Sequence, residues 1–221
     1  MKASCTVRSV SGSADAEPRN PGLPPAPGAD RYPALDLANS AVVLPGGQRL
    51  DLLGEPSAAG RWLVDRALAP EDAELREICA ARMRALRDQV RALFAALVDG
   101  QPPPGAALTA VNDALTRVPT AAPLGWDRVR GPYRTAPHPV DQIVDQALGI
   151  LAANAADLLT GPDAERLTAC PSTPCDRYLL RAGRRHWCSV RCGDRARAAR
   201  AYARRTGNGD AEAPHGGPGS G

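Results

Sequence analysis

Four cysteines near the C-terminal end have the spacing of a metal site. Cys170, Cys175, Cys188 and Cys192 follow the pattern C-x4-C-x12-C-x3-C. Each close pair fits a tight turn that directs both sulfurs inward, and the segment between the pairs brings the second pair round to the first. Zn²⁺ accepts four thiolates, and four sulfur ligands leave no open position for catalysis. We therefore predict one structural zinc ion, whose binding energy folds a segment too small for a core of its own.

Three alternatives remain for this cluster. Two disulfides are disfavoured, because no export signal is visible at the N-terminus and a reducing cytoplasm keeps thiols reduced. An iron–sulfur cluster also takes four cysteines, but two close pairs fit zinc better. His186 could replace one thiol, although the four cysteines already complete the coordination shell.

Arginines crowd around the second cysteine pair. Between Asp176 and Arg205 there are ten arginines and two acids, a net charge of +8 in a chain whose total is +3. The planar guanidinium group matches phosphate oxygens and guanine edges better than an ammonium group does. Local charge of this kind favours nucleic acid over a merely solvated basic surface, which is the other interpretation. The predicted nucleic-acid-binding residues are Arg184, Arg185, Arg191, Arg195, Arg197, Arg200, Arg204 and Arg205.

The stretch DRARAARAYARR after the last cysteine predicts a basic helix. It is rich in alanine, which has the highest helix propensity, and Asp194 stands where a capping residue would. Arg197, Arg200 and Arg204 are three and four residues apart and therefore fall along one face. We expect Ala196, Ala199 and Ala203 to face the metal module or the rest of the protein.

Composition and periodicity predict helices upstream of the cysteines. The chain has only eight aromatic residues, so its core must consist mostly of Leu, Val, Ile and Ala, which favours helices packed on helices. Apolar residues recur in steps of three and four from Pro70 to Gly100, and Cys79 lies on this stripe as a core residue. The same spacing predicts helices over 108–115 and 140–158.

Turn signals add a few short strands. AVVLPGGQRLDLL is expected to form two β-segments joined at Gly46-Gly47, and LGWDRVRGPYRTAP a strand pair that turns at Gly131-Pro132. Ser57 is expected to cap a helix that continues to residue 68. The predicted fold class is mainly α with a few short β-strands, as a helical N-terminal domain plus a small C-terminal four-cysteine zinc-finger module.

Pro-, Gly- and Ser-rich composition marks both ends of the chain as disordered. The predicted organisation has a disordered segment over 1–30, a helical domain over 32–165, a zinc finger over 166–206 and a disordered tail over 207–221. No stretch reaches the roughly 18 apolar residues of a membrane span, so we expect a cytoplasmic protein with no membrane partner.

Two segments resemble a known bacterial family. WCSVRCGDR is similar to the signature of CGNR zinc fingers, with Asp194 in place of Asn and a last cysteine spacing one residue shorter. YPALDLANS resembles the start of the ABATE domain through Leu35, Asp36 and Asn39. The resemblance implies a stress-related transcription regulator with a helical ABATE-like domain and a DNA-binding CGNR finger.

The predicted function is therefore a bacterial transcription regulator that binds DNA through the arginine-rich finger. Its helical domain would act as a sensor or a dimerisation unit, which leaves a homodimer and a small-molecule effector open. The alternative is a zinc-ordered module for RNA or protein without sequence-specific DNA binding. An enzyme with Asp36, Asn39 and His138 in a pocket is a third interpretation, but a helix cap and a core hydrogen bond explain the first two residues better. We predict no enzyme and no catalytic residue.

Overall fold

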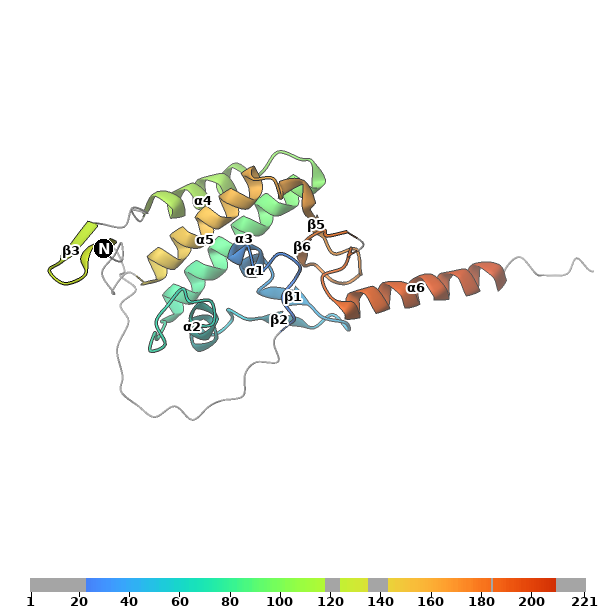
Figure 1. The fold of residues 1–221 in the computed structure, drawn as a ribbon. Helices are drawn as coiled ribbons and strands as arrows, with labels where there is room; N and C mark the ends of the chain where they lie inside the picture. The colour runs from blue at the N-terminus through green and yellow to red at the C-terminus, as the bar shows by residue number, and fades with distance from the viewer. Residues whose placement is uncertain (1–22, 118–123, 135–142, 184, 210–221) are drawn as a thin grey trace, which may run out of the picture.

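The computed structural model describes residues 23–117, 124–134, 143–183 and 185–209. Long helices dominate it (Figure 1), so the prediction of a mainly α fold with a few short strands is confirmed. The helices are α1 (Pro33–Ala38), α2 (Pro56–Val64), α3 (Glu77–Asp99), α4 (Gly105–Arg117), α5 (Ile143–Thr160) and α6 (Val190–Gly209), with a 3-10 turn η2 (Ala164–Arg166).

The core of the protein lies between α1, α3, α4 and α5. It is built from aliphatic side chains around Phe94 and Met83, both fully buried on α3. Cys79 is buried on the same face, as its place on the apolar stripe predicts. The apolar stripe in the sequence begins before the helix does. We expected the helix to begin near Pro70, but the segment before Glu77 is turn and extended chain. Helix α3 ends at Asp99, where Gly100 caps it with a φ of 63°.

Helix α2 also differs from its predicted bounds. Pro56 occupies its first turn, where a missing N–H costs nothing, so Ser57 lies inside the helix and does not cap it. The helix ends at Val64, four residues earlier than expected, and the chain then turns through Ala67 with a φ of 54°.

In the described part of the chain, three antiparallel two-stranded hairpins complete the fold, and each pairs strands adjacent in sequence. The hairpin was predicted to turn at Gly131-Pro132, but it turns over residues 128–130, two to three residues earlier than expected. The Asp127 carboxylate accepts hydrogen bonds from the backbone N–H groups of Val129 and Arg130, both at 2.8 Å, and so closes the turn there. The strands are β1 (Ala41–Val43) with β2 (Arg49–Asp51), β3 (Leu124–Asp127) with β4 (Gly131–Arg134), and β5 (Leu167–Ala169) with β6 (Tyr178–Leu180).

Residues 23–30 are packed, which corrects the expectation of disorder through residue 30. Ala26 and Ala29 are buried, and the Leu180 N–H donates to the Pro27 carbonyl at 2.8 Å. Gly28 adopts a φ of 94° against Leu180, and a Cβ there would lie 2.7 Å from that side chain. Residues 207–209 were also expected to be disordered, but they continue α6. The remaining segments with predicted disorder, before residue 23 and after residue 209, lie outside the described residues.

The β5–β6 hairpin joins the C-terminal module to the helices. Its residues Leu167, Tyr178 and Leu180 belong to the main core. The buried Asn39 side chain donates to the Tyr178 carbonyl and accepts from the Tyr178 N–H, both at 2.8 Å. The tyrosine ring also packs edge to face on Phe94, with centroids 5.7 Å apart. The core therefore continues across the predicted domain boundary at residue 165.

Helix α5 is the most apolar helix described. By length and hydropathy alone it could cross a membrane, and half of it is buried inside the protein. Its buried face packs on α1, α3 and α4, as the core helix of a bundle does.

Candidate metal centre

The four predicted cysteines lie together at the junction of β5, β6 and α6. Cys170 follows β5, Cys175 precedes β6, Cys188 precedes α6, and Cys192 lies in the first turn of α6. All four Sγ atoms lie within 4.8 Å of one another. Their shorter separations are 3.6 Å for Cys175–Cys188 and 3.5 Å for Cys188–Cys192.

These distances match the edges of one tetrahedral site. A Zn–S bond of about 2.3 Å in tetrahedral geometry places neighbouring sulfurs about 3.8 Å apart. Disulfide sulfurs lie about 2.05 Å apart, and the four cysteines carry free thiols, so the disulfide alternative is wrong. His186 is exposed and belongs to no group of metal-ligating side chains among the described residues. The ligand set is therefore four sulfurs.

Backbone hydrogen bonds hold both cysteine pairs in place. In the first pair, the Cys170 N–H donates to the Arg177 carbonyl at 2.8 Å, and the Cys175 N–H donates to the Ser172 carbonyl at 2.8 Å. In the second pair, the Ser189 hydroxyl accepts from the Cys192 N–H at 3.2 Å. Ser189, and not Asp194, therefore caps α6, because the helix begins before the last cysteine.

Crowding of the thiols shifts their pKa values in opposite directions. Hydrogen bonds from the Cys175 and Cys188 thiols lower the pKa of Cys170 to about 2. The same hydrogen bond to the Cys170 thiolate raises the pKa of Cys188 to about 12 and raises the pKa of Cys175 as well. One negative charge therefore keeps its neighbours protonated. A divalent cation at the centre would offset this repulsion and let all four sulfurs ionise.

Arg177 provides positive charge beside the sulfurs from inside the protein. Its side chain is only 4% exposed, and its Nη1 lies 3.9 Å from the Cys188 Sγ. Its Nη2 donates to the Pro24 carbonyl at 2.8 Å, which ties the packed N-terminal segment to the site. Sequence reasoning did not single out Arg177, because its neighbours in the chain give no sign that it is buried.

Arg195 supports the same centre from α6. Its Nη2 lies 3.3 Å from the Cys192 Sγ and donates to the Ser172 carbonyl at 3.2 Å, while its Nε donates to the Thr173 carbonyl at 3.0 Å. It was predicted to contact nucleic acid, but the structure places it half-buried on the loop of the first cysteine pair. Two arginines thus lie next to a site whose zinc complex would carry a charge of −2.

Trp187 packs between the metal module and α6. The Arg197 and Arg200 guanidinium groups lie 5.9 and 5.8 Å from its ring centroid, within the range of a cation–π contact. Gly193 allows this packing, since a Cβ there would lie 3.3 Å from the Trp187 ring. The indole thereby contacts two arginines of the predicted basic face.

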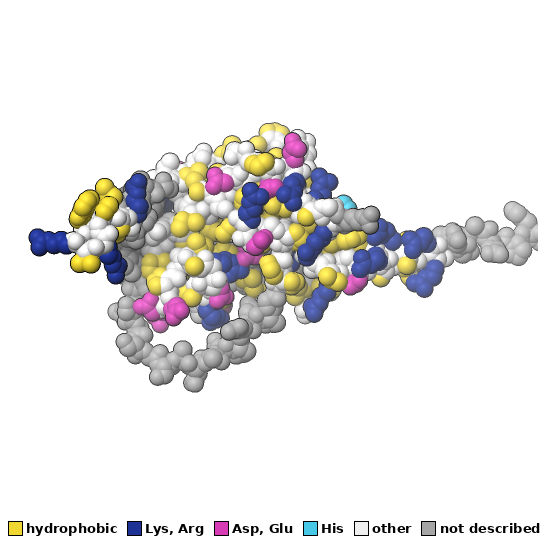
Figure 2. Space-filling view, in the orientation of Figure 1, with side chains coloured by type: hydrophobic (Ala, Val, Ile, Leu, Met, Phe, Trp, Pro, Cys, Tyr) yellow, Lys and Arg dark blue, Asp and Glu magenta, His cyan; other side chains and the backbone are white. Residues whose placement is uncertain are grey.

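Six of the other predicted nucleic-acid-binding residues are exposed on and before α6. This helix projects away from the other helices (Figure 1), and basic side chains follow it outward (Figure 2). Ala196 is half-buried, but Ala199 and Ala203 are exposed, so the expectation that they face the protein is wrong for these two. Arg184 lies outside the described residues. The exposed arginines are Arg185, Arg191, Arg197, Arg200, Arg204 and Arg205.

The residues of the enzyme alternative have structural contacts. Asp36 forms an ion pair with Arg66, whose guanidinium group stacks 4.0 Å from the Trp62 ring centroid. Asn39 is 2% exposed, and its side-chain amide is hydrogen-bonded to the backbone of Tyr178. His138 lies outside the described residues. Asp36 and Asn39 therefore stabilise the fold. Asn39 makes the expected core hydrogen bonds, but Asp36 lies inside α1 and does not cap it, because Tyr32 is the capping residue.

Comparison with protein families gives two matches along the chain. Residues 32–162 match ABATE, described as "Putative stress-induced transcription regulator", and residues 166–205 match the CGNR zinc finger. No curated protein matches the sequence. The second match contains all four cysteines, and together with their geometry it identifies the centre as the site of one structural zinc ion.

Proposed function

The chain belongs to the ABATE family and carries a CGNR zinc finger, and from this premise we propose that it is a transcription regulator that binds DNA through α6. The observation that carries the proposal is the position of this helix. Beyond the metal centre α6 extends into solvent and exposes Arg197, Arg200, Arg204 and Arg205.

The dimensions of α6 suit a DNA groove. The part beyond Gly193 has sixteen residues, and at 1.5 Å per residue it is about 24 Å long. An α-helix with its side chains is about 10–12 Å wide, and the major groove of B-DNA is about 12 Å wide. The zinc ion and Arg195 fix the start of the helix, so the exposed arginines would meet the phosphates on a rigid support.

We assign two different roles to the arginines of the finger. Arg177 and Arg195 contact cysteine sulfurs and backbone carbonyls, and we assign them to the metal centre. Arg197, Arg200 and Arg204 are exposed on the outer part of the finger, and we assign them to the polyanion. Binding through such contacts would weaken steeply with salt, because each phosphate contact releases counterions.

Fluorescence anisotropy with a labelled DNA duplex tests this assignment. Replacing Arg197, Arg200 and Arg204 with alanine should weaken binding and lower the slope of log K against log[salt] by about one for each phosphate that an arginine no longer neutralises. The control replaces two exposed arginines of the body with alanine, Arg49 and Arg117, and should leave both quantities nearly unchanged. Equal effects in the two variants, or tighter binding to RNA or to an acidic protein, would contradict DNA as the ligand.

The helical body has the proposed role of a sensor or dimerisation unit. Four thiolate ligands need reduced cysteines, so the proposed setting is a reducing compartment such as the bacterial cytoplasm. No catalytic step is proposed, because Asp36 and Asn39 are engaged in contacts that stabilise the fold.

A further inference from the structure

The β3–β4 hairpin (residues 124–134) exposes an apolar face that packs on no neighbouring element among those the structure describes. Leu124 and Trp126 are 72% and 73% exposed, and Val129 at the tip is 93% exposed. The pairing register places Trp126 opposite Pro132, so Leu124, Trp126 and Pro132 share one face. Among the described elements, neither strand forms an extended contact except with the other. An isolated two-stranded hairpin is marginally stable in water, which points to a partner for this face.

The hairpin also carries positive charge. Arg128 and Arg130 are exposed and form no ion pair with another described residue. The hairpin contains three arginines, at 128, 130 and 134, and one acid, Asp127, so its net charge is +2. Figure 2 shows hydrophobic and basic side chains side by side at this end of the molecule. Its partner should therefore combine an apolar surface with negative charge.

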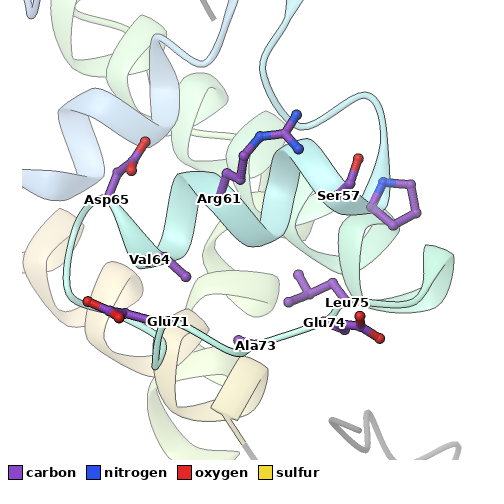
Figure 3. A pocket seen from close by; sticks show the side chains of 9 residues that line it. Ser57, Arg61, Val64, Asp65, Glu71, Ala73, Glu74 and Leu75 are labelled. Carbon is purple, nitrogen blue, oxygen red and sulfur yellow. The ribbon is translucent and has the colours of Figure 1, made fainter. Parts of the chain in front are cut away.

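A pocket beside α2 has these complementary properties. It lies between α2 and the segment 71–75 and has a volume of about 520 Å³. Figure 3 shows Val64 and Leu75 pointing into the gap between the helix and this segment, with Asp65, Glu71 and Glu74 around the rim. Together with Arg61 these acids give the lining a net charge of −2, equal and opposite to that of the hairpin.

We propose that the β3–β4 hairpin of one copy of the chain docks in the α2 pocket of a second copy, and that the exchange is reciprocal. The pocket volume lies within the roughly 300–1,000 Å³ of clefts that hold drug-sized groups, which leaves room for an indole. The Trp126 face covers Val64 and Leu75, and Arg128 and Arg130 meet the Glu71 and Glu74 carboxylates.

The size of the contact favours reciprocal exchange over a single docked hairpin. A hairpin alone offers the eleven residues 124–134, whereas a standard interface uses about 20–30 residues on each side. In a two-fold symmetric dimer each copy contributes both its hairpin and the nine residues that line its pocket, which reaches the lower end of that range. Two copies meeting hairpin to hairpin would instead bring arginines of like charge together.

Charge reversal and its compensation test the pairing. Light scattering and sedimentation should give the wild-type zinc-loaded protein a mass near twice 23.1 kDa at micromolar concentration. The variant Arg128→Glu/Arg130→Glu and the variant Glu71→Arg/Glu74→Arg should each raise the dimer dissociation constant by about tenfold or more. Combining all four changes should return the dimer dissociation constant to within about threefold of the wild-type value, because the positive and negative side chains have exchanged places.

Two further variants separate the contact from general effects. Arg204→Glu/Arg205→Glu makes the same change in net charge on α6 and should leave the dimer intact. Trp126→Ser should weaken the dimer without changing the charge or the zinc content. A monomeric wild type, including one whose hairpin docks in its own pocket, would overturn the proposal. The proposal would also be wrong if the variant with all four changes dimerised as weakly as the two double variants. These measurements contain no nucleic acid, so their outcome is independent of DNA binding.

Discussion

At the scale of single residues, the metal centre depends on charge compensation. Four thiolates around Zn²⁺ leave a charge of −2, and burying that charge is costly unless cations or hydrogen-bond donors surround it. Arg177 and Arg195 supply both, because each guanidinium group contacts a cysteine sulfur and a backbone carbonyl. These two arginines of the finger are thus part of the zinc site and are not available to another ligand.

Replacing Arg177 with leucine should weaken the zinc site. The variant loses the cation beside Cys188 and leaves the Pro24 carbonyl without its donor, so we expect zinc affinity to fall by about 10–100-fold and the free energy of unfolding by about 3 kcal/mol. Competition with a chelator and denaturant titration measure the two effects. Arg181→Leu, at an exposed arginine beyond β6, is the control and should change neither by much. Unchanged zinc affinity in the Arg177 variant would contradict a role in the metal site.

The four ligands could be predicted from the sequence, but their supporting residues could not. Cysteine spacing is a local property, and two close pairs with a short connection are enough to indicate a tetrahedral site. The role of Arg177 depends on Pro24, which lies 153 positions away, and on a fold that buries one arginine among ten. Arg195 was predicted to be a surface residue for the same reason: its contacts in the loop of the first pair are visible only in three dimensions.

At the scale of elements, periodicity predicts the helices better than it predicts their ends. The apolar stripe of α3 begins before the helix, since the residues at 70–76 pack as extended chain beside α2. Helix α6 shows the converse. Its alanines were expected to form a face that packs on the protein. Alanine also has the highest helix propensity, and in α6 it stabilises a helix that extends into solvent away from the other helices.

A proline in α6 should separate its two parts. Ala201→Pro removes a backbone hydrogen bond and clashes with the preceding turn, which costs about 3 kcal/mol within the helix. We expect lower helicity by circular dichroism and weaker DNA binding, while zinc content and the unfolding temperature of the body remain as in wild type. Ala201→Ser is the matched control and should retain most of the helix. Full DNA affinity in the proline variant would show that the outer part of α6 is not the contact surface.

At the scale of the whole molecule, the zinc module and the helical body share one core. Tyr178 packs on Phe94 and is held by Asn39, while Arg91 donates to the Ala38 carbonyl at 2.6 Å and to the Asp176 carbonyl at 2.9 Å. The sequence indicated a boundary near residue 165, because composition and function change there. Packing across that boundary could not be predicted, since β6 is only three residues long and its partners come from the other end of the chain.

Removing zinc should therefore destabilise the helical body as well as the finger. Without the ion, the cysteines that flank β6 are no longer held together, so β6 becomes less ordered. Tyr178 and Leu180 on this strand then pack less well in the main core. If the coupling is worth about 3 kcal/mol, the unfolding temperature should fall by roughly 6–12 °C for a chain of this length. Helicity by circular dichroism and the fluorescence of the buried Trp62 report the body and measure this shift on addition of a chelator. Asn39→Ala breaks the link to Tyr178 and should reduce the shift. A body that melts at the same temperature with and without zinc would show that the two parts are independent.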